Sequence, residues 1–262
     1  CVLPGTQGQR RDGPAGKGDL RSGGAVGKAD GDAAQLIAEG QGRFAAVLRQ
    51  GQQVQPGIPL RRQRIQQGLN AGHGFPDGGA VGMHGSVEST LNLKIAKKTE
   101  KILKDKGFHV IMTRRKEDGI HSCEGSVAQK KKDDMRKRLE IINSGKADIF
   151  VSIHMNKFTD ARYRGAQVIY SANFKESEEL AQLIQSAFWK VDKSCAHREA
   201  MRAPSGIFLL KNAKIPAVIA ECGFLSNADD EQLLGTDSHR SAVARAIADG
   251  IEQYYRESEV NQ

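Results

Sequence analysis

Two patterns of hydrophobic positions alternate along the chain after residue 69. Short apolar runs of four or five residues, as expected for buried strands, alternate with longer stretches whose apolar residues recur at helical spacing. In the first long stretch, Leu91, Ile95 and Ile102 fall on one face of a helix. This alternation predicts an α/β fold with amphipathic helices packed on an open sheet. The expected strands are 108–112, 149–153, 166–170, 207–210 and 217–220, and the expected helices are 88–106, 133–144, 176–191 and 238–255.

Residues 1–68 follow neither pattern. They hold 14 of the 29 glycines, 4 of the 7 prolines and one aromatic residue, Phe44. Such a composition cannot bury enough apolar surface to offset chain entropy, so we expect a low-complexity segment at 1–68 and a folded domain at 69–262. Two origins stay open for the segment, a native linker or a stretch translated in a foreign reading frame. The chain begins with Cys1, and no export signal is visible in it.

The formal net charge of +8 favours a polyanionic partner, either nucleic acid or an anionic cell-wall polymer. Most of the basic excess lies in 1–68, which has a single aromatic residue for stacking on bases, so nucleic acid is not expected. The four cysteines, Cys1, Cys123, Cys195 and Cys222, are too scattered for a disulfide framework or a metal knuckle. No stretch approaches the roughly 18 consecutive apolar residues of a spanning helix, so no integral membrane segment is expected.

Four residues with metal-binding or catalytic chemistry stand at the ends of predicted elements. His73 lies between two glycines of a Gly-rich loop, and Glu88 falls in the first turn of a predicted helix. His154 and Glu221 each end an apolar strand, where α/β proteins place their sites. Ordinary alternatives are a turn residue for His73, a favourable helix-dipole position for Glu88 and a hydrogen-bonded core histidine for His154. Burying a carboxylate without a partner is costly, which favours a functional role for Glu221.

Together these side chains form a donor set for metal-assisted hydrolysis. Two histidines and a carboxylate suffice for a catalytic zinc ion, which keeps its fourth position for water. Glu221 is then a spare carboxylate, able to take a proton from water and return it to a leaving amine. The pattern therefore predicts amide hydrolysis with zinc as the cofactor.

Five motifs follow one another in the chain: Ala71-Gly72-His73-Gly74, Glu88 with Leu91-Asn92-Leu93, Met112-Thr113-Arg114, Ser152-Ile153-His154-Met155-Asn156 and Glu221-Cys222-Gly223-Phe224-Leu225-Ser226-Asn227. Because these motifs occur in the family's order, the chain from about 70 to 255 resembles the zinc-dependent N-acetylmuramoyl-L-alanine amidases of bacterial cell walls. The resemblance implies that His73, Glu88 and His154 ligate zinc. It also implies a catalytic carboxylate at Glu221 and a mixed sheet of about six strands flanked by helices. The runs 74–82 and 155–158 look most like the germination-specific spore-cortex branch of the family.

The first strand implied by the resemblance departs from the family pattern. A central strand before the His-Gly loop should be apolar and β-branched, but the chain has Arg64-Ile65-Gln66-Gln67-Gly68-Leu69 there. If residues 1–68 are foreign sequence, this strand would pair poorly with its neighbours and would support His73 poorly.

Other residues keep two interpretations. Arg114 either binds a peptide carboxylate of the substrate or makes a structural ion pair, and Asn156 is assigned to substrate binding. Cys222 is either a nucleophile or a small buried residue. The stretch 115–134 has no apolar periodicity and is long for a connection, which predicts a lid over the site or a solvated loop.

The predicted function is hydrolysis of the amide between N-acetylmuramic acid and the L-alanine of the peptidoglycan stem peptide. The alternative is a non-catalytic cell-wall-binding module on the same fold. Because peptidoglycan lies outside the cytoplasm, we expect the protein in the cell envelope or outside the cell, at the wall or the spore cortex. An activating protein partner is left unidentified.

Overall fold

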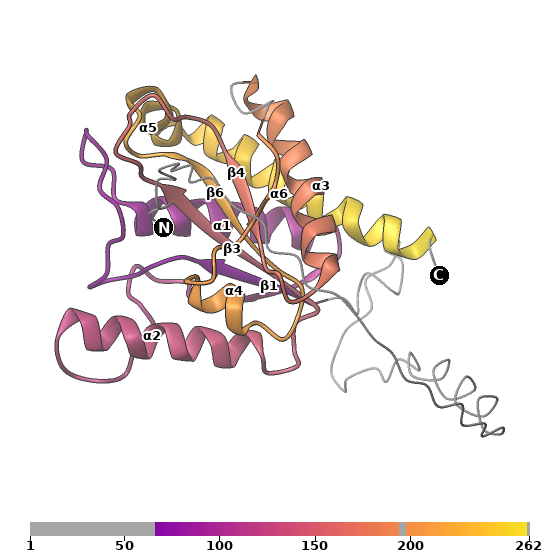
Figure 1. Ribbon diagram of the computed structural model, residues 1–262, viewed down its shortest axis with the longest axis horizontal. Coiled ribbons are helices and arrows are strands. Elements are labelled where there is room, and N and C mark those ends of the chain that lie inside the picture. The colour runs from indigo at the N-terminus through magenta and orange to yellow at the C-terminus, as the bar shows by residue number, and fades with distance from the viewer. Residues whose placement is uncertain (1–65, 194–197, 261–262) are drawn as a thin grey trace, which may run out of the picture. The chain divides into compact units, whose positions relative to one another are not determined.

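The computed structural model describes residues 66–193 and 198–260, and Figure 1 shows them as a sheet with helices on both faces. Its six strands are arranged in the order β2-β1-β3-β6-β4-β5. Neighbouring strands are parallel except β4 and β6, which are antiparallel. The predicted α/β fold with a mixed sheet is thus confirmed. The strands are β1 (Gln66–Ala71), β2 (His109–Met112), β3 (Ile149–Asn156), β4 (Gln167–Tyr170), β5 (Met201–Arg202) and β6 (Ala217–Phe224).

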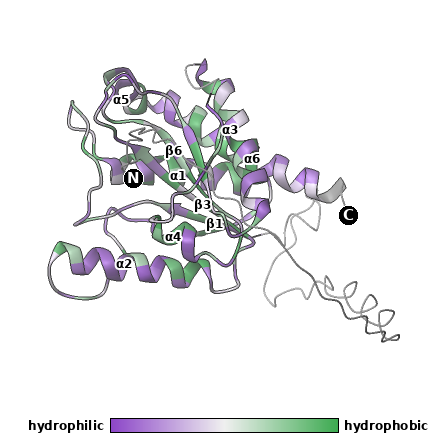
Figure 2. Ribbon diagram, viewed as in Figure 1, coloured by the Kyte–Doolittle hydropathy of each residue, from purple (hydrophilic) through white to green (hydrophobic). Residues whose placement is uncertain are grey.

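Helices α1, α3 and α6 cover one face of the sheet, and α2 and α4 cover the other (Figure 1). Alternation along β6 explains the two cores: Val218 and Ala220 join the larger one, whereas Ala217 and Ile219 join the smaller one. In Figure 2 the central strands are largely hydrophobic and the helices carry hydrophilic stripes. The helices are α1 (Glu88–Asp105), α2 (Val127–Ile142), α3 (Lys175–Val191), α4 (Phe208–Asn212), α5 (Ala228–Gly235) and α6 (Asp237–Val260). None of these described helices has the length and apolar character needed to cross a membrane.

The prediction of a strand at 207–210 is wrong, because helix α4 begins there. A turn precedes the helix, in which the Ile207 N–H donates to the Pro204 carbonyl (3.3 Å). Leu209 and Leu210 are then buried in the smaller core. A run of four apolar residues does not by itself distinguish a strand from a buried helical turn.

The prediction that the second helix begins at 133 is also wrong, because α2 begins at Val127. Ser126 and Gln129 form a capping box, in which the Ser126 hydroxyl accepts the Gln129 N–H and the Gln129 side chain accepts the Ser126 N–H. The second part of the stretch 115–134 is therefore helical rather than a lid or a solvated loop. The first turns of α2 are mostly exposed, which is why this part of the sequence shows no apolar periodicity.

Residues 66–71 form a central strand despite their polar sequence. β1 pairs in parallel with β2 on one side and with β3 on the other. Leu69 and Ala71 are buried in the larger core. Gly68 suits the close packing, because a Cβ there would lie 3.1 Å from the Ile149 carbonyl oxygen. The expectations for 1–65 fall outside the described residues.

Gln67 is the residue of β1 that fits its surroundings least. It is 1% exposed and lies on the same face of the strand as Leu69. Its amide lies beside the Tyr255 hydroxyl, and both amide atoms and that hydroxyl are buried without a hydrogen-bond partner among the described residues. A buried polar group without a partner costs about 1–3 kcal/mol.

We expect Gln67→Ile to raise the free energy of unfolding by about 1–3 kcal/mol, because the unpaired amide is replaced by an apolar β-branched side chain. Urea unfolding measures the change. Gln66→Ile, at the partly exposed neighbouring position, is the control and should alter the free energy by less than about 0.5 kcal/mol. A destabilised Gln67→Ile variant would show that the amide is satisfied after all.

Candidate metal centre

Three adjacent strands bring the predicted site residues together. His73 follows the end of β1, His154 lies near the end of β3, and Glu221 on β6 is the register partner of His154. Glu88 is the first residue of α1. Because the carboxyl ends of parallel strands share one edge of a sheet, residues far apart in the sequence meet there.

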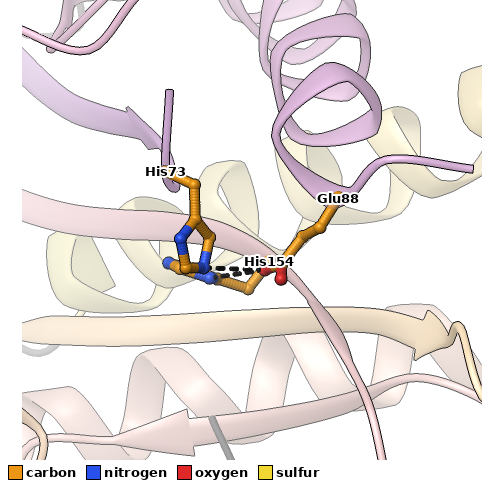
Figure 3. A group of neighbouring side chains, drawn as sticks. All are labelled: His73, Glu88 and His154. Atoms are coloured by element: carbon orange, nitrogen blue, oxygen red, sulfur yellow. Dashed lines mark hydrogen bonds and ion pairs between the residues drawn. The ribbon is translucent and has the colours of Figure 1, made fainter. Parts of the chain in front are cut away.

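His73, Glu88 and His154 form one cluster (Figure 3). Oε1 of Glu88 lies 2.9 Å from Nδ1 of His154 and 3.3 Å from Nε2 of His73. The two imidazole rings meet edge to face, with centroids 5.1 Å apart and planes at 75°. Within residues 66–193 and 198–260, this is the one group of three or more His, Cys, Asp or Glu side chains close enough to share a metal ion.

The spacing of these atoms fits the dimensions of zinc. Zinc bonds of about 2.0–2.2 Å place two ligand atoms of a tetrahedron roughly 3.3–3.6 Å apart. The measured separations of 2.9 and 3.3 Å are close to that range. Two imidazoles and one carboxylate are also the number and kind of protein ligands found in catalytic zinc sites, which keep one position open.

The electrostatics of the cluster favour a cation. Burial alone would raise the pKa of Glu88, but its hydrogen bonds with His154 and His73 outweigh that effect and hold the pKa well below its usual range. Burial likewise opposes charge on His73, yet the Asp77 and Glu88 carboxylates raise its pKa to about 9. Burial lowers the pKa of His154. Positive charge is therefore stabilised at His73, beside the Asp77 and Glu88 carboxylates, and disfavoured at His154.

Glu221 lies fully buried beside this cluster. Within residues 66–193 and 198–260, neither of its carboxyl oxygens has a hydrogen-bond partner. Burial, with a further contribution from the Glu88 charge, raises its pKa to about 7. An unpaired buried carboxyl is costly to keep, and a pKa near neutrality suits a group that both takes and gives a proton. The observed position agrees with the predicted role of a spare carboxylate.

Arg114 and Arg138 hold the loop that carries His73. Arg114 is buried and donates to the carbonyls of Ala71, Gly72, Ser89 and Lys116 at 2.7–3.0 Å. Arg138, from α2, donates to the carbonyls of Ala71 (2.7 Å) and His73 (2.5 Å) and pairs with Asp134. Burial and the nearby Arg138 charge lower the pKa of Arg114 to about 10. These contacts favour the structural interpretation of Arg114 over binding of a substrate carboxylate.

His73 needs such support because its backbone has φ +59°, a left-handed conformation that residues other than glycine rarely adopt. The far end of the same loop is fastened by Glu231 of α5, whose buried carboxylate accepts the N–H groups of His84 and Ser86 at 2.9–3.0 Å. Gly82 leaves room for it, since a Cβ there would overlap the Glu231 carboxylate. Charged side chains therefore anchor the loop between His73 and Glu88 at both ends.

Two further predicted residues are buried. Asn156 is 2% exposed, and its carbonyl accepts the Leu225 N–H (2.8 Å), so its position gives no support to substrate contact. Burial, reinforced by the charges of Glu221 and Glu88, raises the pKa of the Cys222 thiol well above its ordinary value. A thiol that resists ionisation is a poor nucleophile, which favours the interpretation of Cys222 as a small buried residue.

Sequence reasoning missed Asp77, Arg138 and Glu231. Asp77 Oδ2 lies 2.8 Å from Nδ1 of His73, the ring nitrogen that faces away from Glu88. Asp77 and Glu231 are both near the motifs recognised in the sequence, which is the one signal that could have drawn attention to them. Arg138 acts through backbone carbonyls, and such contacts leave no pattern in the chain.

A cluster of two histidines and a glutamate beside an unpaired carboxyl, at the carboxyl edge of an α/β sheet, has the side chains of a metal-assisted hydrolase. The chain belongs to the N-acetylmuramoyl-L-alanine amidase family, whose sequence profile matches residues 68–253. It is a peptidoglycan hydrolase, which cleaves the amide between N-acetylmuramic acid and the L-alanine of the stem peptide. The activity predicted from the sequence is confirmed, and the alternative of a non-catalytic module is set aside.

Several relatives support this assignment. The germination-specific N-acetylmuramoyl-L-alanine amidase of Bacillus subtilis is 35% identical over 191 residues, which cover 72% of this chain and 79% of the relative. The CwlD amidase of Clostridioides difficile, whose structure was determined in complex with the GerS lipoprotein, matches with a TM-score of 0.70 and 35% identity over 73% of this chain and 98% of that chain. The catalytic domain of CwlV from Bacillus (Paenibacillus) polymyxa var. colistinus matches with a TM-score of 0.61 and 29% identity over 73% of this chain and 98% of that chain. The likeness to the germination-specific branch is thereby confirmed.

Proposed function

We propose that this amidase is a zinc enzyme in which His73, Glu88 and His154 hold the metal and Glu221 is the catalytic base. The observation that carries the proposal is the three-ligand cluster beside a buried carboxyl that has no hydrogen-bond partner among the described residues. Glu221 and His154 are opposite each other on adjacent strands, which places the carboxyl next to the ligands. A single site therefore supplies both a metal position and a proton acceptor.

When bound, zinc supplies an electrophile that polarises a carbonyl and makes water more acidic. Glu221 takes a proton from the attacking water and gives it to the nitrogen of the departing L-alanine. Burial tunes this carboxyl for both steps, because a pKa of about 7 allows it to accept and release a proton near neutral pH. Arg114 and Arg138 keep His73 in place and take no proton.

The substrate locates the enzyme in the cell envelope or outside the cell. Relatives named as a germination-specific amidase and as a probable cell wall amidase support the spore cortex or the wall as its place of action. We also propose a protein partner for the chain, since the structure of the CwlD amidase was determined in complex with a lipoprotein. The catalytic domain is proposed to be 69–262, with 1–68 as a low-complexity segment; the family match from residue 68 supports this boundary.

Metal analysis of the purified chain, combined with mass spectrometry of digested peptidoglycan, tests the proposed function. About one zinc per chain is expected, because the cluster offers a single set of three ligands. The digest should contain stem peptides with a free L-alanine amine and glycan with unsubstituted N-acetylmuramic acid. Release of these peptides by a chain that holds no zinc would contradict the proposed zinc mechanism.

We expect Gly72→Ala to weaken zinc binding by about 10- to 100-fold, the effect of disturbing a group that orients a ligand. The reason is steric: a Cβ at residue 72 would overlap the His154 imidazole, so the ring must move. Competition with a chelator measures the affinity. Gly206→Ala is the matched control, because a Cβ there meets no atom within 4 Å. Unchanged affinity of Gly72→Ala would speak against His154 as a ligand.

A further inference from the structure

Helix α2 holds the candidate ligand His73 at two points. Lys131, Asp134 and Arg138 are three and four residues apart, so they share one face of the helix. Arg138 donates to the His73 carbonyl, as described above. Nζ of Lys131 lies 3.0 Å from Oδ2 of Asp77, and the same oxygen lies 2.8 Å from Nδ1 of His73. The backbone and the ring of His73 are thus both held from α2.

We propose that Asp77, held by Lys131, is a positioning residue that fixes the His73 ring with Nε2 toward the metal. The inference rests on the proposed zinc function of the cluster. A carboxylate that accepts the Nδ1–H of an imidazole leaves the lone pair on Nε2 free for a metal and sets the ring orientation. In the structure, Nδ1 faces Asp77 and Nε2 faces Glu88, as this role requires.

The other contacts of Asp77 fix its own position. Its backbone exchanges two hydrogen bonds with Gly74, both of 2.9 Å, which close the turn after His73. Its Oδ1 accepts the Gly79 N–H at 3.2 Å. Gly79 packs directly on the cluster, since a Cβ there would lie 2.5 Å from Oε2 of Glu88 and 2.8 Å from Cδ2 of His73. One carboxylate therefore orders both the ring and the backbone that covers it.

Substitution of Lys131 distinguishes two possible roles of Asp77: orienting the His73 ring, or only shaping the loop. Its side chain is half exposed, and its ion pair with Asp77 adds little to folding stability. If Asp77 only shapes the turn, loss of Lys131 has no effect on the metal. If Asp77 orients His73, loss of Lys131 loosens Oδ2 and weakens the metal site slightly.

The experiment uses full-length variants and measures zinc affinity by chelator competition and the visible absorption spectrum of the cobalt-substituted protein, which reports ligand geometry. We expect Asp77→Ala to lower zinc affinity by about 10- to 100-fold and to alter the cobalt spectrum. Asp77→Asn, which keeps a hydrogen-bond acceptor, should recover part of the affinity. Lys131→Met should lower it about 2- to 5-fold, in line with the strength of an exposed ion pair.

Two controls match these changes. Asp105→Ala breaks another exposed Asp–Lys pair, with Lys101, at the opposite end of α1 from Glu88. Lys132→Met removes the exposed neighbour of Lys131. Both should leave the affinity and the cobalt spectrum unchanged, and thermal unfolding of the metal-free variants checks that each one folds.

Wild-type affinity and spectrum in Asp77→Ala would overturn the proposal. Should Asp77→Ala fail to fold, wild-type affinity in both Asp77→Asn and Lys131→Met would overturn it as well. A wild-type chain that binds no zinc contradicts the proposed function and this inference together. Wild-type zinc binding and amidase activity, with no response to these substitutions, contradicts the inference alone.

Discussion

The Glu221→Gln variant is expected to keep zinc and to hydrolyse peptidoglycan about 100- to 10,000-fold more slowly than the wild-type chain, which is the usual contribution of general acid–base catalysis. Glutamine has the size of glutamate but cannot carry a proton between water and the leaving amine. The substitution leaves His73, Glu88 and His154 in place, so metal content should not change. Elemental analysis and mass spectrometry of released stem peptides measure the two properties separately.

Loss of the fold would not explain this result. Neither oxygen of Glu221 has a partner in the described part of the chain, so glutamine breaks no hydrogen bond there and removes an ionisable group from a buried position. We therefore expect Glu221→Gln to unfold at a temperature no lower than the wild-type chain. Glu124→Gln, at a fully exposed side chain, serves as the control and should keep full activity. A Glu221→Gln rate above about a tenth of the wild-type rate would refute the base role.

Three of the four candidate site residues, Glu88, His154 and Glu221, could be located from the sequence because each one stands at an end of an element with a clear hydrophobic pattern. His73 was indicated instead by the glycines on both sides of it. The order of strands in a sheet cannot be obtained from such a pattern. Placing these residues at one edge of the sheet does not require the strand order, because the carboxyl ends of parallel strands lie at the same edge in any order. His154 and Glu221 lie opposite each other because β3 and β6 are neighbours in the sheet, although β4 and β5 lie between them in the sequence.

The supporting residues could not be predicted in the same way. Arg138 and Glu231 act on backbone carbonyl and N–H groups, which every residue has, so no spacing of side chains marks their targets. Asp77 reaches His73 across a tight turn whose geometry the residues alone do not define. The start of α2 was missed for a different reason: its first turns face solvent, and a capping box was the one signal present.

The first strand shows tertiary context overriding local preference. Gln66 to Leu69 have little of the apolar β-branched character of a central strand, yet β2 and β3 pair with them on both sides. The polar character of this strand has a visible cost at one point: the buried amide of Gln67 has no partner among the described residues, whereas the strand pairing is intact.

Substitution of either of the two histidines proposed as ligands is expected to remove zinc from the chain. His73→Ala and His154→Ala each leave two of the three protein ligands, so the affinity should fall by more than the roughly 100-fold that accompanies loss of an outer partner. Added zinc at 1,000 times its dissociation constant stabilises a folded protein by about 4 kcal/mol, so the wild-type chain should unfold at a higher temperature with zinc than without it.

Neither histidine variant should show that zinc-dependent rise. His109→Ala, on the edge strand β2, is the matched control: it removes an imidazole outside the cluster and should keep the full response to zinc. Thermal unfolding with and without zinc, together with elemental analysis, shows whether each variant still binds zinc. Because a folded metal-free variant is measured in the same series, loss of the zinc response is distinguished from loss of the fold. If both histidine variants retain about one zinc per chain, the ion is bound elsewhere and the ligand assignment is wrong.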